Sequence, residues 1–257
     1  MSSFNFKKKY GQNFLKNDNI SNKIVDSIEP TSNDLIIEIG PGAGAITEKL
    51  KKYNCQLIAF EIDQETHKYL DKLEDDKTKI IYSDFLEVDL KQILNDYIYD
   101  KLYIIGNLPY YITTPIIEKI IDSKINPESI TIMVQKEVGD RFLASPHTKE
   151  YGYITVLLNY WYDMKKIVDV DKIDFYPIPK VDSVVLKLSK KDSREIDYNK
   201  FKKILKEAFQ FKRKTIGNNI ASIDKNVLLE VLQKHNYTLQ SRAEELDLET
   251  FIDMSIL

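Results

Sequence analysis

The chain has 257 residues, of which 43% are hydrophobic and 30% are charged, a composition typical of a folded globular protein. No apolar run approaches the roughly 18 to 20 residues that a membrane-spanning helix needs, so we expect a cytoplasmic protein without a membrane partner. The single cysteine, Cys55, excludes an intramolecular disulfide, and with only three histidines a structural zinc site is disfavoured, so we expect no metal. A net charge of −3 argues mildly against a nucleic-acid partner, unless the basic residues are clustered.

Apolar runs of strand length alternate with helical patterns between residues 20 and 145. This alternation is the signature of a parallel sheet covered by helices, in which strands buried on both faces are almost continuously apolar. Two later strand-like runs, Trp161–Val168 and Ser183–Leu188, are expected to form a terminal hairpin on the sheet. The five strands predicted before them are Leu35–Ile39, Leu57–Glu61, Lys79–Ser83, Leu102–Gly106 and Ile130–Val134. The fold class is therefore α/β, with a Rossmann-like sheet.

Helices are predicted over Ile20–Ile28 and Pro115–Asp122. After residue 188 the sequence changes to a polar linker, and the pattern that follows is helical only. We place a domain boundary there, with the sheet domain over residues 1–188 and a small all-helical domain over residues 189–257. Asp247 is expected to cap the last helix of the second domain.

A glycine-rich turn begins at Gly40, directly after the first predicted strand, and Glu61 ends the next strand. Glycines such as Gly40 and Gly42 let the backbone approach a nucleotide, and a carboxylate at the second strand end can accept hydrogen bonds from both ribose hydroxyls. The pattern also satisfies the dinucleotide fingerprint, so a nicotinamide oxidoreductase stays open. Asp84 follows the third strand, where it could read an adenine amino group, and this favours S-adenosylmethionine as the cofactor. The alternative is that Glu61 and Asp84 only cap helices or end strands.

The run Asn107-Leu108-Pro109-Tyr110 follows the fourth strand and has the residue types used to methylate exocyclic amines. The lone pair of adenine N6 is delocalised into the ring, so the amine is a poor nucleophile. The side-chain oxygen of Asn107 and the carbonyl of Leu108 could accept its two hydrogens and direct the lone pair at a methyl group. Pro109 would fix that carbonyl, and Tyr110 would stack on the base. The alternative is a simple turn at the strand end.

Together with these motifs, the sequence resembles the small-subunit ribosomal RNA adenine N6,N6-dimethyltransferases over essentially the whole chain. The motifs that carry the resemblance are Lys9-Tyr-Gly-Gln-Asn-Phe-Leu, Glu38-Ile-Gly-Pro-Gly-Ala-Gly, Asn107-Leu-Pro-Tyr-Tyr-Ile, Met133-Val-Gln-Lys-Glu-Val, Phe175-Tyr-Pro-Ile-Pro-Lys-Val-Asp-Ser-Val-Val and Arg242-Ala-Glu-Glu-Leu. The resemblance implies a class I methyltransferase sheet with a small helical C-terminal domain that contributes to RNA binding. It also implies a monomer that dimethylates two adjacent adenines near the 3′ end of small-subunit rRNA during ribosome assembly.

The resemblance implies further site residues. Asn13 and Leu15 should contact the cofactor together with Gly40, Gly42, Glu61, Asp84 and Asn107. Phe175 resembles a second aromatic residue that would sandwich the flipped adenine against Tyr110, and flipping is required because a stacked base cannot present N6. The alternative for Phe175 is a core aromatic before a Pro-x-Pro turn. The sequence departs from the family pattern at His147, at Tyr153-Ile-Thr and at Gly217, which affects expectations for RNA contact.

Basic residues are concentrated in an otherwise acidic chain, and this favours phosphate contact over a merely solvated helix face. One cluster is Lys7, Lys8 and Lys9. The other consists of Lys200, Lys202, Lys203, Lys206, Lys212, Arg213 and Lys214.

In addition to the nicotinamide oxidoreductase, two other functions remain open beside the small-subunit enzyme. The first is a large-subunit rRNA adenine methyltransferase of the antibiotic-resistance type, which shares the core motifs, although residues 175–185 and 242–251 argue against it. The second is a non-catalytic RNA-binding assembly factor on the same fold, which the intact Asn107, Tyr110 and Glu61 disfavour.

Overall fold

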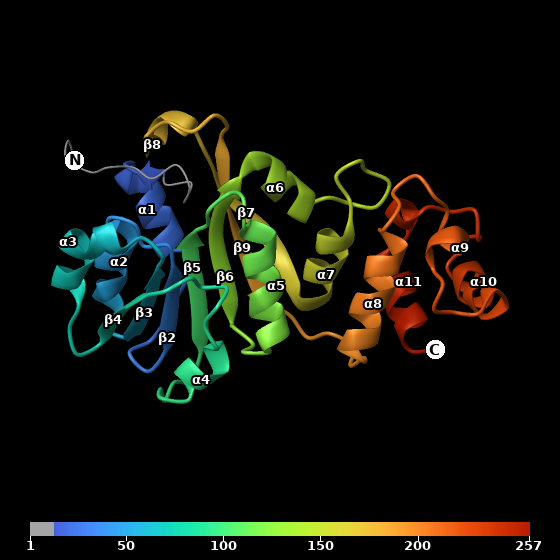
Figure 1. Ribbon diagram of the computed structural model, residues 1–257, viewed down its shortest axis with the longest axis horizontal. Helices are drawn as coiled ribbons and strands as arrows, with labels where there is room; N and C mark the ends of the chain where they lie inside the picture. Colours follow the sequence, from blue (N-terminus) through green and yellow to red (C-terminus); the bar gives the residue numbers. More distant parts are fainter. Residues whose placement is uncertain (1–12) are drawn as a thin grey trace. The chain divides into compact units, whose positions relative to one another are not determined.

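The computed structural model describes residues 13–257, which fold into two compact units (Figure 1). The first unit extends to Gly139 and also contains Lys165–Lys190, whereas the second contains Asp140–Met164 and Lys191–Leu257. The predicted boundary at residue 188 is close to the change of unit after Lys190, but residues 140–164 also belong to the second unit. The reason is that helix α7 (Tyr153–Trp161) packs on other helices of that unit. The basic run at Lys7 to Lys9 lies outside the described residues.

A mixed sheet of seven strands forms the frame of the first unit as the structure describes it, in the order β4-β3-β2-β5-β6-β9-β7. The pairs β4–β3, β3–β2, β2–β5 and β5–β6 are parallel. The five predicted strands are confirmed and differ from the structure by one residue at most at either end. The strands are β2 (Leu35–Ile39), β3 (Gln56–Glu61), β4 (Thr78–Tyr82), β5 (Leu102–Asn107), β6 (Ser129–Gln135), β7 (Tyr162–Val170) and β9 (Ser183–Lys190).

The two strands of the predicted terminal hairpin, β7 and β9, are neighbours in the sheet. β9, the later of the two in the sequence, lies between β6 and β7. β9 pairs antiparallel with β6, with Ser183 opposite Gln135, and β7 takes the edge. The difference follows from burial, because β9 begins with four buried residues whereas β7 is mostly exposed between its buried ends. A further short pair, β1 (Phe14–Leu15) with β8 (Phe175–Tyr176), is antiparallel and separate from the main sheet.

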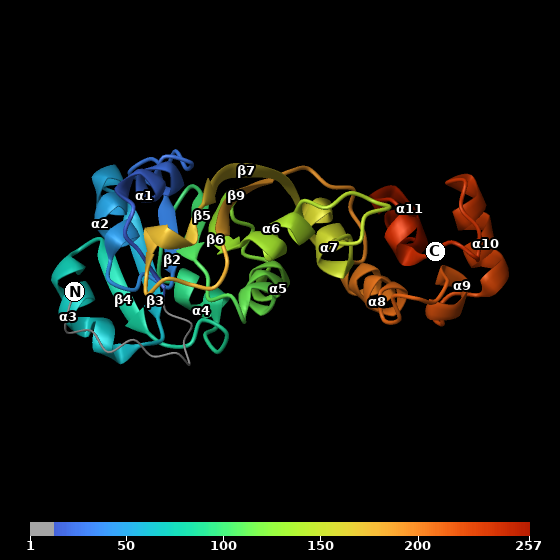
Figure 2. The ribbon, with the colours of Figure 1, turned by 90° about the horizontal axis from the view of Figure 1, so that it is seen from above.

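Helices cover both faces of the sheet (Figure 2). α1 (Asp18–Val25) starts two residues before the predicted helix because the Asn17 side chain accepts from two backbone N–H groups of its first turn. α5 (Thr113–Ser123) contains Pro115 in its first turn, where a missing N–H is tolerated. The remaining helices of this unit are α2 (Ala45–Leu50), α3 (His67–Leu70), α4 (Leu90–Leu94) and the first half of α6 (Lys136–Phe142), with short 3-10 turns at Lys51–Tyr53, Gln64–Thr66, Asp71–Leu73 and Lys172–Asp174.

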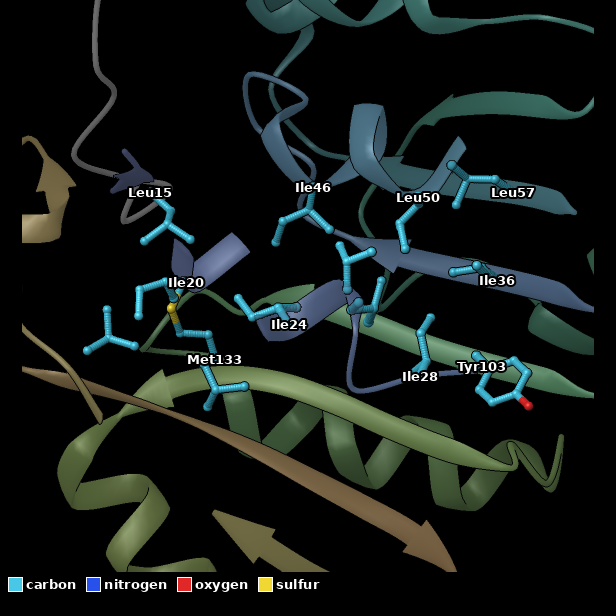
Figure 3. Packing of buried hydrophobic residues seen from close by; sticks show 14 of the residues in the cluster. Leu15, Ile20, Ile24, Ile28, Ile36, Ile46, Leu50, Leu57, Tyr103 and Met133 are labelled. Carbon is cyan, nitrogen blue, oxygen red and sulfur yellow. The ribbon is translucent and has the colours of Figure 1, made fainter. Parts of the chain in front are cut away.

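One hydrophobic core of the first unit lies between one sheet face and helices α1 and α2 (Figure 3). Ile24 of α1 and Leu50 of α2 face Ile36 of β2 and Met133 of β6 in this cluster. Because these side chains are almost completely removed from water, the apolar contacts hold the carboxyl ends of the strands in fixed positions. A rigid rim of strand ends is therefore available to position side chains.

The second unit is built from helices, apart from the first residues of β7. α7 packs against α8 (Tyr198–Ala208) and α11 (Leu248–Ser255), and α11 also contacts α10 (Lys225–Lys234). Asp247 accepts a hydrogen bond from the backbone N–H of Thr250, which confirms it as the cap of α11. Two short helices, α9 (Ile216–Asn219) and the 3-10 turn Ala243–Glu245, complete this unit as described.

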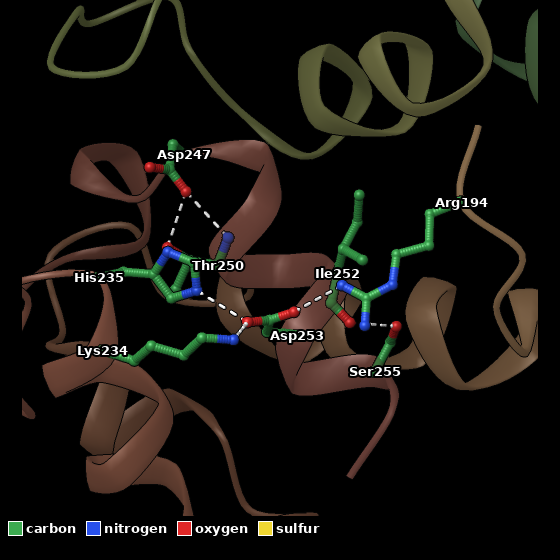
Figure 4. A network of polar contacts seen from close by, with 8 residues as sticks. All are labelled: Arg194, Lys234, His235, Asp247, Thr250, Ile252, Asp253 and Ser255. Atoms are coloured by element: carbon green, nitrogen blue, oxygen red, sulfur yellow. Dashed lines mark hydrogen bonds and ion pairs between the residues drawn. The ribbon is translucent and has the colours of Figure 1, made fainter. Parts of the chain in front are cut away.

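A buried carboxylate ties three segments of the second unit together (Figure 4). Asp253 of α11 accepts from Lys234 and from Nε2 of His235, 3.0 Å away, at the end of α10. Its other oxygen accepts from Arg194, 2.9 Å away, in the segment before α8. These donors, Lys234 first, lower the pKa of Asp253 to about 2, so the carboxylate stays charged and cross-links the unit at neutral pH.

The structure shows the local backbone geometry at two of the departures from the family pattern. His147 has a φ of 67°, in the left-handed region that favours glycine, and its N–H donates to the Glu244 carbonyl. At Gly217, an added Cβ would lie 3.0 Å from both Cβ and the carbonyl oxygen of Leu239, so a larger residue would need that segment to shift. Within residues 13–257, no helix has both the length and the apolar character required to cross a membrane.

Candidate active site

A cavity of about 290 Å³ opens at the carboxyl ends of β2, β3, β4 and β5, in the first unit. This edge is where parallel α/β sheets bind their ligands, because the loops that follow the strands leave a crevice there. All the predicted site residues except Phe175 line the cavity. They are Asn13, Leu15, Gly40, Gly42, Glu61, Asp84, Asn107, Leu108, Pro109 and Tyr110.

The glycine turn after β2 lies against the turn after β5. Gly40 has a φ of 71°, and an added Cβ would lie 3.3 Å from the Asn107 carbonyl oxygen. Gly42 has a φ of 59°, and a Cβ there would lie 2.8 Å from the ring of Phe14. Since L-residues rarely adopt such φ values, both positions require glycine for conformation as well as for space. The two predicted motifs therefore form one site.

Glu61 anchors the glycine turn from the end of β3. Its Oε2 accepts from the N–H of Gly42 at 3.0 Å, and its Oε1 accepts from the N–H of Asp63 at 2.8 Å. Burial raises the pKa of Glu61, and these two N–H groups oppose the rise. Each carboxylate oxygen has further acceptor capacity, so Glu61 can still receive hydroxyl donors from the cavity.

Glu38 is a second buried carboxyl in this region, on β2. Neither of its oxygens makes a hydrogen bond of good geometry with a described residue, although the hydroxyl and N–H of Thr47 lie near enough to favour the charged form. Burial, together with the nearby charge of Glu61, raises the pKa of Glu38 to about 8, so its carboxyl is mostly protonated at neutral pH.

Asp84 lies in the loop after β4, half-buried on the cavity wall. Its Oδ1 accepts from the N–H of Leu86 at 2.9 Å, which makes a local turn. Asp84 therefore forms a local turn just beyond a strand end, close to the alternative of a strand-end residue, and it also lines the cavity.

The turn after β5 is held by hydrogen bonds at each of its four residues. The Asn107 side-chain N–H donates to the Asn13 carbonyl at 3.1 Å, and the Leu108 N–H donates to the Met133 carbonyl at 3.1 Å. The Pro109 carbonyl accepts from Ile112 N–H and from the Thr113 hydroxyl, both at 3.2 Å. The Tyr110 hydroxyl is 2.6 Å from Oγ of Ser183. The turn is therefore rigid before any substrate arrives.

The structure does not bring Phe175 to the cavity. Its ring is completely buried in a hydrophobic core that also contains Leu15. Phe175 and Leu15 are paired in the short β1–β8 ladder. This position corresponds to the core alternative, because the short β pair turns the ring inward while the neighbouring Tyr176 is 46% exposed.

Besides the buried rings of Phe60 and Phe85, two aromatic residues of the cavity wall were not predicted as site residues. Phe14 covers Gly42, and Tyr111 lines the cavity with 58% of its surface exposed. Each adjoins a predicted residue, so treating Asn13 to Leu15 and Asn107 to Tyr110 as parts of longer motifs would have found them.

The comparisons with known proteins agree with this geometry. The sequence model of a family described as ribosomal RNA adenine dimethylase matches residues 3–257. The chain belongs to this family. It is an rRNA adenine dimethyltransferase whose methyl donor is S-adenosylmethionine.

The most similar relatives carry one name, ribosomal RNA small subunit methyltransferase A. The protein from Aster yellows witches'-broom phytoplasma (strain AYWB) is 41% identical, with 97% of this chain and 95% of the relative covered. The protein from Macrococcus caseolyticus (strain JCSC5402) is 37% identical, with 98% of this chain and 90% of the relative covered.

Among solved structures, a dimethyladenosine transferase from Plasmodium falciparum has a TM-score of 0.79 and 25% identity, with 94% of this chain and 95% of that chain covered. The 23S rRNA methyltransferase ErmE has a TM-score of 0.71 at 19% identity, with 94% and 98% covered. At that identity ErmE supports the fold of the dimethyltransferase alone.

The side chains of the dimethyltransferase cavity fit S-adenosylmethionine. The glycine turn lies close to its neighbours, because a Cβ at Gly40 or Gly42 would meet the Asn107 carbonyl or the Phe14 ring. Two carboxylates, Glu61 and Asp84, stand at the neighbouring strand ends. Carboxylates there suit the hydroxyl and amino donors of an adenosine, and the apolar part of the wall suits its ring.

Proposed function

We propose that this dimethyltransferase transfers methyl groups to N6 of two adjacent adenines in the 3′-terminal hairpin of small-subunit (16S) rRNA. The observation that carries the proposal is the contact between the two turns, with the Asn107 carbonyl 3.3 Å from where a Cβ of Gly40 would lie. An amine held at the Asn107 turn is thereby adjacent to a cofactor held at the glycine turn. The relatives named small subunit methyltransferase A, 36–42% identical, support the choice of ribosomal subunit.

The cofactor is held by residues from several strand ends. Glu61 would accept the ribose hydroxyls and Asp84 the adenine amino group, while Gly40, Gly42 and the segment from Asn13 to Leu15 line the rest of the wall. S-adenosylmethionine supplies an electrophilic methyl group on a sulfonium. The chain's own contribution is to place an amine beside it.

Asn107 and Leu108 hold the amine. Because the Asn107 N–H donates to Asn13, its Oδ1 is the side-chain atom that accepts one N6 hydrogen. The Leu108 carbonyl accepts the other hydrogen, and Pro109 restricts the backbone beside it. With both hydrogens engaged, the nitrogen is drawn toward tetrahedral geometry and its lone pair points at the methyl carbon.

The reaction needs no dedicated general base. The nitrogen lone pair forms the new N–C bond as the S–C bond breaks, and the electron pair of that bond stays on sulfur. The methylated ammonium then loses a proton to water or to a nearby acceptor. Orientation supplies the rate enhancement, for which up to about 7 to 11 kcal/mol is available. A second transfer, to an N6-methyl amine that has one hydrogen left to donate, gives the N6,N6-dimethyl product on each adenine.

Tyr110 provides the stacking face for the adenine. A base inside a stack cannot present N6 in line with the sulfonium, so the target nucleotide must leave its stack and lie against this ring. Phe175 is not in a position to form a second face while it remains in the core. Phe14 and Tyr111, which also line the cavity, are further aromatic residues that can contact the nucleotide.

RNA contact outside the cavity is assigned to the second unit. The side chains of Lys202, Lys203 and Lys206 line one shallow surface hollow on α8. Beyond α8, Phe211 is 47% exposed, and the Lys214 ammonium lies 4.2 Å from its ring centroid. Exposed cations next to an aromatic face suit phosphates and unstacked bases.

The enzyme that we propose is cytoplasmic and monomeric and acts on a subunit that is still assembling.

The test is incubation with labelled S-adenosylmethionine and undermethylated small or large ribosomal subunits, followed by mapping of the modified nucleotides. We expect label on two neighbouring adenines of the small-subunit RNA, each with two methyl groups. Label on large-subunit adenine would assign the enzyme to the antibiotic-resistance type instead. If the protein binds the cofactor but transfers no methyl group to either subunit, the result would indicate a non-catalytic assembly factor.

A further inference from the structure

Ser183 stands behind the catalytic turn without lining the cavity. It is the first residue of β9, has no exposed surface, and lies 73 residues from Tyr110 in the sequence. Its Oγ is 2.6 Å from the Tyr110 hydroxyl, a short distance for a hydrogen bond between two hydroxyl groups.

The backbone around Ser183 is fixed from two sides. Ser183 pairs with Gln135 in the β6–β9 ladder. The preceding Asp182 accepts from Lys136 N–H through its carbonyl and from Lys172 N–H through its carboxylate, both at 3.0 Å. A hydroxyl on such a segment has little freedom, and a group that it holds has a defined position.

Tyr110, in contrast, belongs to the turn after β5 and is only half-buried. Rotation about its side-chain bonds would move the ring away from the position in which a base can stack. Burial raises the pKa of Tyr110, so its hydroxyl remains protonated at neutral pH and can take either role in the hydrogen bond.

We propose that Ser183 is a positioning residue for methyl transfer, which holds the Tyr110 ring in the orientation that stacks on the target adenine. This inference rests on the proposed function, in which Tyr110 is the stacking face. Ser183 itself touches neither the base nor the cofactor. Its effect reaches the reaction through the geometry of the ring alone.

Two variants break the same hydrogen bond from opposite ends. Ser183→Ala removes Oγ, and Tyr110→Phe removes the hydroxyl but keeps the stacking ring. Each should lower kcat on undermethylated small subunits by about tenfold, the factor expected from the loss of one partly buried hydrogen bond. KM for S-adenosylmethionine should stay within about twofold, since neither hydroxyl is assigned to the cofactor.

The double variant makes the test specific. If the two hydroxyls act only through each other, Ser183→Ala with Tyr110→Phe should be no slower than either single variant. Ser189→Ala, at the other end of the same strand, is the matched control and should keep the native kcat. A thermal unfolding curve for each variant separates loss of folding from loss of rate, and Tyr110→Phe remains a valid test if Ser183→Ala does not fold.

Three results would overturn the inference. These are a native kcat in folded Ser183→Ala or in Tyr110→Phe, a double variant whose loss is the product of the two single losses, or an equal loss in Ser189→Ala. The proposed function fails separately, because it fails only if the native enzyme places no methyl group on small-subunit adenine N6.

Discussion

The side-chain amide of Asn107 donates to the backbone carbonyl of Asn13 across 94 residues of sequence, at 3.1 Å. This contact joins the segment before β1 to the last residue of β5, on the wall of the cavity. It fixes which end of the amide faces the substrate, because the nitrogen is already used. The first prediction follows from that orientation.

Asn107→Ala should reduce methyl transfer at least about 100-fold, because an amine that is not held by its hydrogens presents its lone pair poorly. Cofactor affinity should fall less than the rate, and the fold should be retained. Single-turnover transfer from labelled S-adenosylmethionine measures the rate, and circular dichroism checks folding. Asn95→Ala, at an exposed position after α4, is the control. Near-native turnover in Asn107→Ala would remove the role that we assign to this residue.

Glu61→Ala should weaken S-adenosylmethionine binding by about 10- to 100-fold, since hydrogen bonds to a charged acceptor are lost and the Gly42 turn loses its anchor. Isothermal titration with S-adenosylhomocysteine measures the affinity, and stabilisation of the fold by the ligand should shrink in parallel. Glu65→Ala, exposed in the turn that follows, should bind as the native enzyme does. Unchanged affinity in Glu61→Ala would place the ribose elsewhere.

The positions of Glu61, Asp84 and Asn107 could be predicted because each directly follows or ends a buried apolar run, and parallel strands bring such positions to one edge. The position of Phe175 could not be predicted in this way. Its burial depends on pairing with Leu15, far earlier in the sequence, in a strand of two residues that leaves no periodic signal.

The assignment of residues 140–164 to the second unit could not be predicted from the sequence either. An apolar helix such as α7 shows that it will be buried but does not show which core it will join, and here it packs on α8 and α11. In the sequence, Ser183 is one residue of the Phe175 motif, and nothing there indicates its role. Its hydrogen bond to Tyr110 forms only when β9 is placed in the folded sheet.

Glu38→Gln should change the pH dependence of stability. The pKa of Glu38 is raised to about 8 in the fold, against an ordinary value of 4.5, so between these values the unfolded chain binds fewer protons than the folded one. Stability therefore falls as pH rises through this window, and the neutral amide that replaces the carboxyl removes that loss. Melting temperatures should be similar for the two proteins at pH 4.5 and higher for Glu38→Gln at pH 8.

The control for this comparison is Glu230→Gln, on the exposed face of α10, whose melting temperature should follow the native protein at both pH values. A gap between Glu38→Gln and the native protein that is equal at pH 4.5 and pH 8 would contradict the assigned protonation of Glu38.

Charge reversal of Lys212 and Arg213 tests the basic surface of the second unit. Both are exposed in the turn after α8, where the Lys212 ammonium donates to the Lys149 carbonyl. The variant Lys212→Glu/Arg213→Glu should bind undermethylated small subunits about 10- to 100-fold more weakly at about 0.15 M salt, with a shallower dependence on salt concentration, because fewer counterions are released from the RNA.

The matched control carries the same change in charge on the first unit. Lys79→Glu/Lys91→Glu alters exposed residues of β4 and α4. If phosphate contact is local to the turn after α8, this control should bind with nearly native affinity and the native salt slope. Filter binding over a salt series measures the affinity and salt slope of both variants. Equal weakening of both variants would indicate a response to net charge. Unchanged binding of Lys212→Glu/Arg213→Glu would remove this turn from the RNA interface.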